Sequence, residues 1–140
     1  SMTMEDGAAV AEMEHQLFSD GWSEKSVLET LSRPNSICLM AEKAGRAAGY
    51  ILAYTAAGEA EIARIAVAKE LQRQGVARAL LEELASLCKT QGIAKLLLDV
   101  RSGNAAARAL YEKSGFREDG IRQRFYQDPE EDAVLMSKEI

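Results

Sequence analysis

Histidine and cysteine are scarce in this sequence of 140 residues, which has one histidine and two cysteines. His15 has no second histidine and no cysteine near it in the sequence, so we expect it at the surface. A Ser-His-Asp triad and a histidine-based zinc site are thereby excluded, and we predict no metal site. Cys38 and Cys88 lie in apolar surroundings without a CxxC spacing. We expect both to be buried reduced thiols rather than disulfide partners, metal ligands or nucleophiles.

The sequence also lacks a membrane-spanning apolar run, a signal-peptide core and a basic net charge. Without the first two we expect a cytoplasmic protein with no membrane contact. The net charge of −5 argues against direct nucleic-acid binding through phosphates, and it would suit a basic protein or peptide partner. A length of 140 residues that are 47% hydrophobic predicts one domain over residues 1–140. Ser1 is interpreted as a remnant of tag cleavage.

Hydrophobic periodicity predicts the order of the helices and strands. Apolar residues recur at helical spacing in 5–18, and Ser23 and Asn104 are good N-caps for two later helices. The run 94–100, AKLLLDV, is almost continuously apolar, which is typical of a strand buried on both faces. Helices are expected at 5–18, 23–31, 75–91 and 105–114, and strands at 36–43, 47–57, 59–68, 94–100, 116–127 and 132–140. This order predicts an α/β (α+β) fold, a mixed sheet with helices on both faces.

The helix at 75–91 begins without the Ser, Thr, Asp or Asn that usually caps a helix. Its start, QRQGVAR, places Gly75 between Arg73 and Arg78. The first N–H groups of a helix have no intrahelical partner, and the helix dipole favours negative charge there. Bare amides beside two arginines therefore predict a phosphate or pyrophosphate site. The alternative is a glycine that is simply tolerated at a helix start, since no Walker A loop or dinucleotide fingerprint is present.

Several motifs together resemble one family. QRQGVA matches the Gln/Arg-x-x-Gly-x-Gly/Ala motif with which the GNAT N-acetyltransferases bind the pyrophosphate of acetyl-CoA. LLLDVRSGNAAARALYEKSGF resembles the second half of that signature, and IARIAV stands where the cofactor-facing strand belongs. GWSEKSVLETL and RFYQDPEEDAVLM resemble the RimI-type subgroup, the ribosomal-protein-alanine N-acetyltransferases. The resemblance spans nearly the whole chain and implies a mostly antiparallel GNAT sheet flanked by helices.

The first strand of that fold is expected to be short or missing. Only SMTM precedes Glu5, where the strand belongs. Either the strand is vestigial or the chain begins late. A sheet edge left open in this way would favour dimerisation, so we expect a monomer or a weak dimer.

The resemblance implies which residues bind acetyl-CoA. The loop amides would hold the pyrophosphate, with charge-assisted contacts from Arg73 and Arg78. The backbone of the strand 65–67 would pair with the pantetheine arm and polarise the thioester carbonyl, while the side chains of Ile65 and Val67 are expected in the core. Asn104 would both cap its helix and contact the cofactor. The implied cofactor-binding residues are Ile65, Ala66, Val67, Arg73, Gln74, Gly75, Val76, Ala77, Arg78 and Asn104.

Two residues are implied for the chemistry. Tyr111 stands where the family has the general acid for the CoA thiolate, and a phenol stays protonated at neutral pH. Asp99, in LDVR, stands where RimI-type enzymes carry a glutamate as general base, and it would act through a water. The alternatives are a packing role for Tyr111 and, for Asp99, a contact with Arg101 or a backbone N–H. Glu61 is the reserve candidate for the base.

The predicted function is transfer of an acetyl group to the N-terminal α-amine of a protein, the alanine of a small-subunit ribosomal protein. Trp22, Tyr126 and the acidic loop DPEED would shape the acceptor groove, although Glu130, Glu131 and Asp132 are expected to form a solvated loop. Two alternatives remain. One is the same chemistry on lysine or on a small-molecule amine, and the other is a non-catalytic CoA-binding module.

Overall fold

A computed structural model describes residues 2–18, 21–127 and 129–140, so the prediction for Ser1 lies outside the described residues. The order of elements agrees with the prediction. The elements are η1 (Met4–Asp6), α1 (Gly7–Leu17), α2 (Glu24–Ser32), β1 (Ser36–Lys43), β2 (Arg46–Ala56), β3 (Glu59–Val67), η2 (Lys69–Leu71), α3 (Val76–Thr90), β4 (Lys95–Arg101), α4 (Ala105–Lys113), β5 (Arg117–Tyr126) and β6 (Glu131–Glu139).

The six strands form one sheet in the order β1-β2-β3-β4-β6-β5. Only β3 and β4 pair in parallel, and the other neighbouring strands are antiparallel. A parallel pair needs a long crossover, and α3 supplies it between β3 and β4. The predicted mixed, mostly antiparallel sheet is therefore confirmed.

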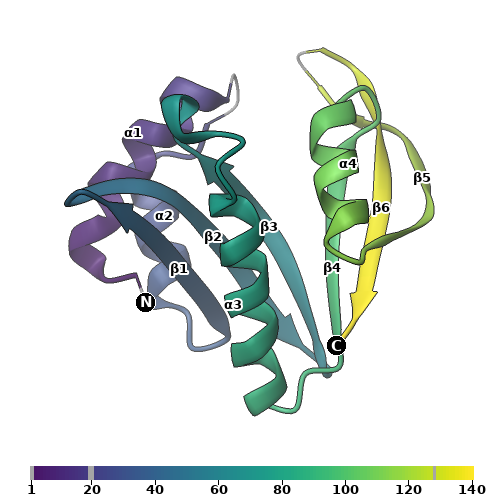
Figure 1. Cartoon of the computed structure of the whole chain (residues 1–140), viewed down its shortest axis with the longest axis horizontal. Helices are drawn as coiled ribbons and strands as arrows, with labels where there is room; N and C mark the ends of the chain where they lie inside the picture. Colours follow the sequence, from purple (N-terminus) through teal and green to yellow (C-terminus); the bar gives the residue numbers. More distant parts are fainter. Residues whose placement is uncertain (1, 19–20, 128) are drawn as a thin grey trace.

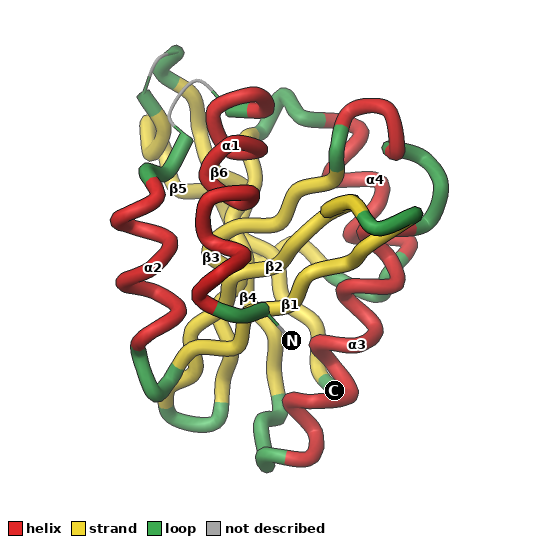
Figure 2. The backbone as a smooth tube through the Cα atoms, turned by 90° about the vertical axis from the view of Figure 1, so that its left-hand side faces the viewer, coloured by secondary structure: helices red, strands yellow, loops and turns green. Residues whose placement is uncertain are grey.

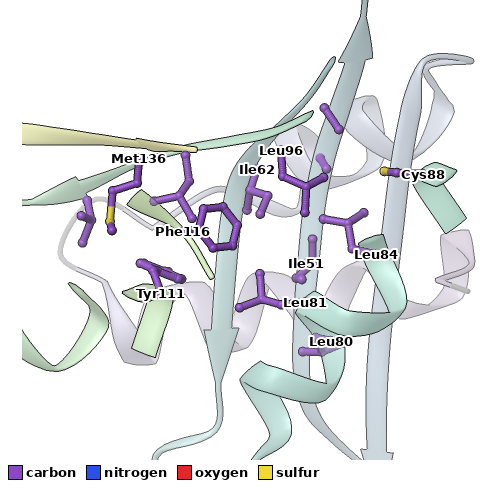
Figure 3. Close-up of a cluster of buried hydrophobic side chains, with 14 of the residues drawn as sticks. Ile51, Ile62, Leu80, Leu81, Leu84, Cys88, Leu96, Tyr111, Phe116 and Met136 are labelled. Atoms are coloured by element: carbon purple, nitrogen blue, oxygen red, sulfur yellow. The ribbon is translucent and has the colours of Figure 1, made fainter. Parts of the chain in front are cut away.

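Helices cover both faces of the sheet, as predicted, with α1 and α2 on one side and α3 on the other (Figures 1 and 2). Two apolar clusters result. The larger one joins α3 and α4 to the sheet, and the smaller one joins α1 and α2 to it. Figure 3 shows the larger cluster, where the ring of Phe116 lies between Met136 and Ile62. Gly49 allows α3 to pack closely, because a Cβ there would lie 3.2 Å from Cγ1 of Val76 and 3.3 Å from Cδ1 of Leu80.

The prediction that 94–100 is buried on both faces is wrong. Burial alternates along β4, with Leu96, Leu98 and Val100 buried and the residues between them half-buried. The buried side chains belong to the cluster under α3 and α4. The other face carries Asp99, and it opens into a cleft described below. An almost continuous apolar run therefore hides a strand with two different faces.

The N-terminal end fits the expectation of a short or missing first strand. Among the described residues, no strand precedes α1. One backbone hydrogen bond remains at this edge of the sheet, from the N–H of Met2 to the carbonyl oxygen of Cys38 on β1, at 3.0 Å.

Candidate active site

The two parallel strands separate in the middle of the sheet. Pairing between β3 and β4 runs from Glu59↔Lys95 to Ile62↔Leu98 and ends there. Beyond this point β3 keeps its pairing with β2 up to Val67, and β4 keeps its pairing with β6 up to Arg101. Figure 1 shows β3 and β4 close together at one end and far apart at the other. The second half of β3 thus presents backbone toward a gap rather than toward a neighbouring strand.

The start of α3 has the geometry that the sequence predicts for an anion site. Its N-cap, Gly75, has φ of +83°, no side chain caps the helix, and its first turn carries no acidic residue. Arg73 also has positive φ, at +65°. Left-handed backbone at these two positions turns the chain sharply into the helix and leaves the first N–H groups of α3 facing outward. Bare amides of this kind attract an anion such as a pyrophosphate.

A cleft of about 440 Å³ opens in front of this helix start. We call it the loop cleft. It is bounded by the end of α1, the second half of β3, the turn before α3, and α4. The predicted cofactor residues that line it are Ile65, Ala66, Val67, Arg73, Gly75, Val76, Ala77, Arg78 and Asn104. The sequence prediction therefore gathered residues that do meet around one cavity.

Gln74 is placed differently from its neighbours in the loop. It does not line the loop cleft, and its side-chain oxygen accepts a hydrogen bond from Lys43 at 2.8 Å. Gln72 belongs to the QRQGVA motif but was outside the predicted set. It lines the cleft, and its amide donates to the carbonyl oxygen of Val67 at 3.2 Å. Gln72 thus connects the loop before α3 to the end of β3.

A second cleft of about 620 Å³ lies on the other side of the gap. We call it the hairpin cleft, because the end of β5 forms one of its walls. Trp22 and Tyr126, the two aromatic residues predicted for an acceptor groove, both line it, together with Glu61 and Asp99. Phe125 stands at its rim with 42% of its surface exposed. The hairpin cleft is therefore open to solvent on this side.

The two clefts meet at α4. Asn104, Ala107 and Tyr111 line both of them, as does Ile65 of β3. Tyr111 is only 7% exposed and packs on Phe116, with 5.8 Å between the ring centroids. Burial raises the pKa of the Tyr111 phenol, and the nearby Tyr126 raises it further. The phenol at the junction of the clefts therefore keeps its proton well beyond neutral pH.

Asp99 is the half-buried carboxylate of the hairpin cleft. Burial raises the pKa of Asp99, and the positive charge of Arg122 partly offsets this effect. Among the described residues the Asp99 carboxylate makes no hydrogen bond, and the alternative contact with Arg101 is not formed, since that guanidinium points to the β5–β6 turn. Glu61 lines the same cleft but is exposed. Asp99 is thus the carboxylate with the more desolvated environment.

A buried ion pair holds the wall of the hairpin cleft next to α1. Glu14 is fully buried, and one of its oxygens accepts from Arg64 Nε at 2.9 Å, Arg64 Nη2 at 2.6 Å and the N–H of Trp22 at 2.9 Å. Its other oxygen accepts from the Tyr50 hydroxyl. The Arg64 guanidinium lies over the ring of Phe18, 4.3 Å from its centroid, and 5.6 Å from that of Trp22. This network was not predicted.

A signal for that network was present in the sequence. Arg64 interrupts the apolar run IARIAV, and Glu14 follows Val10 by one helical turn on the apolar side of α1. A charge inside each of two apolar patterns indicates a buried pair, because neither charge could be buried alone.

The prediction of a solvated acidic loop is wrong for Glu131. Its Oε1 lies 3.4 Å from Arg101 Nη1, and its Oε2 accepts from the N–H of Gly103 at 2.6 Å. Asp132 is also engaged, since it accepts from the N–H of Arg124 at 2.9 Å. Glu130 is exposed, as predicted. Glu131 thus attaches the β5–β6 turn to the turn before α4.

The remaining sequence predictions concern single residues. Ser23 accepts from the N–H of Ser26, and Asn104 accepts from the N–H of Ala107, which confirms both N-caps. His15 is exposed, Cys88 is buried and Cys38 is half-buried, and both thiols are free. In the described ranges no cluster of His, Cys, Asp or Glu could hold a metal ion. No described helix is long and apolar enough to cross a membrane.

Comparison with known proteins agrees with this geometry. The profile of the acetyltransferase (GNAT) family matches residues 7–116. The chain is 36% identical over 142 residues to the ribosomal protein bS18-alanine N-acetyltransferase of Escherichia coli (strain K12), covering 100% of this chain and 95% of that protein. The crystal structure of the ribosomal-protein-S18-alanine N-acetyltransferase from Escherichia coli has a TM-score of 0.92 at 36% identity, covering 100% of this chain and 91% of that one.

An acetyltransferase from Bacillus anthracis solved in complex with acetyl coenzyme A is 25% identical, with a TM-score of 0.73, and the match covers 80% of this chain and 66% of that one. The fold, the uncapped helix start beside a cleft and these similarities lead to one conclusion. The chain belongs to the acetyltransferase (GNAT) family.

Proposed function

We propose that the protein transfers the acetyl group of acetyl-CoA to the N-terminal α-amine of a protein, the alanine of a small-subunit ribosomal protein. As a GNAT family member the chain is an N-acetyltransferase that uses acetyl-CoA as its cosubstrate. The observation that carries the proposal is the meeting of two clefts at Tyr111, with a backbone-lined cleft on one side and an open, aromatic cleft on the other. Such a junction lets donor and acceptor approach each other from opposite sides.

The loop cleft fits the donor. A pyrophosphate would lie on the N–H groups at the start of α3, where no side chain competes for them, with Arg73 and Arg78 beside it. The backbone of β3 beyond Ile62 has left its pairing with β4, so it can pair with an amide-containing arm as an added strand would. The bound cosubstrate supplies an activated thioester carbonyl to the junction.

The hairpin cleft fits an amine on a polypeptide. Its arginines Arg64 and Arg101 are each paired with a carboxylate, so Glu61 and Asp99 supply negative charge near the junction, which the positive charge of Arg122 partly offsets at Asp99. Negative charge there attracts an ammonium group. The exposed rim at Phe125 leaves room for a chain that continues outward. A closed pocket would instead select a small molecule, so the open rim favours a protein N-terminus.

The residues at the junction divide the proton transfers between them. The ammonium must lose a proton before its nitrogen can attack the thioester carbonyl, and Asp99 accepts that proton, directly or through a water. As the N–C bond forms and the C–S bond breaks, the Tyr111 phenol donates its proton to the leaving thiolate, and the second proton that the nitrogen releases restores the phenol, directly or through water. The α-amine suits a weak base of this kind, since its ordinary pKa is about 8 against about 10.4 for lysine.

The acceptor is drawn from the relatives. The bS18-alanine N-acetyltransferase of Escherichia coli is 36% identical over the whole of this chain, and the two folds agree with a TM-score of 0.92. Because the similarity to the Escherichia coli enzyme covers the whole of this chain, it includes both walls of the hairpin cleft. It supports the same class of acceptor, a ribosomal protein that begins with alanine.

The test is CoA release from acetyl-CoA in the presence of three acceptors: a ribosomal peptide with a free N-terminal alanine, the same peptide with a blocked N-terminus and an internal lysine, and a polyamine. We expect release with the free alanine peptide alone. Release only with the blocked peptide or with the polyamine would contradict the α-amine proposal while leaving the family assignment intact. Silence with all three acceptors in a protein that binds acetyl-CoA would contradict catalysis on this class of acceptor.

A further inference from the structure

The two strands that separate at the site each carry an arginine with the same kind of surroundings. Arg64 lies on β3 and Arg101 at the end of β4. Each guanidinium is paired with a carboxylate and lies over an aromatic ring that lines the hairpin cleft, and neither of them lines the loop cleft. The same arrangement therefore occurs on both sides of one cleft.

Arg101 holds the wall formed by the end of β5. Its Nη2 donates to the carbonyl oxygen of Gln127 at 3.1 Å, and its Nη1 donates to the carbonyl oxygen of Pro129 at 3.0 Å. The guanidinium lies 4.5 Å from the ring centroid of Tyr126. Glu131, which accepts from Arg101, is the strand partner of Tyr126 in the β5–β6 ladder. Arg101 therefore holds Tyr126 in three ways. It lies over the Tyr126 ring, it bonds the carbonyl oxygen of the next residue, Gln127, and it pairs with Glu131, the cross-strand partner of Tyr126.

The bond network also reaches the cofactor side. Glu131 accepts from the N–H of Gly103, and the next residue, Asn104, lines both clefts. A Cβ at position 103 would lie 2.7 Å from the Glu131 carboxylate, so glycine lets this carboxylate approach the turn closely. The wall at Tyr126 is thus fixed relative to the turn that begins α4.

Arg64 holds the opposite wall. Its guanidinium lies over Phe18 and near Trp22, and Glu14 binds both that guanidinium and the N–H of Trp22. The carboxylate is fully buried and the arginine is 16% exposed, so the pair is shielded from solvent. Shielded pairs with several hydrogen bonds keep their geometry, whereas exposed pairs do not.

We propose that Arg64 and Arg101 are positioning residues that fix the two aromatic walls of the hairpin cleft at the separation that the acceptor requires. This rests on the proposed function, because it assigns the hairpin cleft to the acceptor. The two arginines touch neither the reacting atoms nor the loop cleft. Their loss should therefore act chiefly on acceptor binding and change acetyl-CoA binding much less, since Phe18 and Asn104 line both clefts.

Arginine-to-lysine variants test this directly. Lysine keeps the positive charge for Glu14 or Glu131, but it lacks the planar fork that bonds two acceptors and stacks on a ring. We expect R64K and R101K each to raise the KM for the alanine peptide about tenfold, with the KM for acetyl-CoA within about twofold of wild type. The matched control is R124K, on the same hairpin, where the arginine side chain is 82% exposed and pairs with the exposed Glu130.

Two further measurements can be made on the protein without any catalytic reaction. Trp22 is the only tryptophan of the chain, so tryptophan fluorescence, excited where tyrosine does not absorb, reports on one wall alone. R64K should shift its emission and increase its quenching by acrylamide, and R101K should not. Amide exchange followed by NMR reports on the other wall, and it should become faster at Tyr126 and Gly103 in R101K but not in R124K.

The outcomes separate the two proposals. Wild-type silence toward every peptide would contradict the proposed function, while the fluorescence and exchange results would still decide whether the arginines hold the walls. Unchanged fluorescence in R64K and unchanged exchange in R101K would overturn the positioning role, whatever the wild type acetylates. Two other results would overturn the claim that the arginines serve the acceptor. One is a disturbed wall with an unchanged KM for the peptide, and the other is a KM for acetyl-CoA that rises as much as the KM for the peptide.

Discussion

The buried pair of Glu14 and Arg64 makes a large stability effect predictable from one substitution. Arg64→Met keeps the length of the side chain and removes its charge, which leaves the Glu14 carboxylate buried without its cation. The carboxylate retains bonds from the Trp22 N–H and the Tyr50 hydroxyl, but it loses both guanidinium bonds. Breaking one side of a buried pair costs about 3–5 kcal/mol. Exposed pairs contribute about 0–1 kcal/mol, so burial decides the size of the effect.

Urea unfolding followed by circular dichroism measures this cost. With an m-value of about 2 kcal/mol/M, the midpoint of Arg64→Met should fall by about 1.5–2.5 M relative to wild type. Arg117→Met, which breaks only exposed pairs with Asp119 and Glu139, is the control and should move the midpoint by less than about 0.5 M.

A second variant covers the case in which Arg64→Met does not fold. Tyr50→Phe removes one hydrogen bond to the same carboxylate and should cost about 1.5–3 kcal/mol. If both variants unfold at the same urea concentration as the control, the network contributes no more than a surface pair, and the reasoning from burial is refuted.

Four other predictions concern the junction of the clefts and the start of α3. Tyr111→Phe should leave acetyl-CoA affinity within about twofold and lower kcat by about 10²-fold or more; wild-type turnover would remove Tyr111 as the acid. Because the pKa of Tyr111 is raised, the wild-type rate should show no alkaline decline from this phenol below pH 10. Asp99→Asn should lower kcat about 10²–10⁴-fold and Glu61→Gln far less; the reverse order would make Glu61 the base. Gly75→Val should weaken acetyl-CoA binding at least about tenfold, measured by calorimetry, because φ of +83° strains a β-branched residue by about 1–3 kcal/mol; unchanged affinity in a folded variant would refute the loop assignment.

The parts of the fold that follow from local chemistry could be read from the sequence. The 3.6-residue period of α3, its missing cap and the glycine at its start are properties of one short segment, and so are the caps at Ser23 and Asn104. The turn before α3 was predicted as an anion site because its neighbours in sequence are also its neighbours in space. The role of Tyr111 follows instead from the resemblance of the segment around it to the GNAT family.

The features missed by the sequence arise from contacts between distant segments. Glu14 and Arg64 lie fifty positions apart and meet only because α1 packs on β3. Glu131 looks like a solvated acid until β4 brings Arg101 to it. The point at which β3 and β4 separate leaves no pattern in either strand, since AKLLLDV reads as apolar up to Asp99. For the buried pair, the sequence signal is a charged residue that interrupts an apolar pattern in each of the two segments.

In the proposed reaction, acetyl transfer goes to a protein α-amine at the junction of the two clefts. The most direct measurement offers both amines to the enzyme on one molecule: a ribosomal peptide with a free N-terminal alanine and an internal lysine is incubated with acetyl-CoA, and fragment masses locate the acetyl group. We expect a single acetyl group on the alanine nitrogen in wild type, with that product strongly reduced in Tyr111→Phe. An acetyl group on the lysine, or none on a peptide that the protein binds, would contradict the proposed reaction.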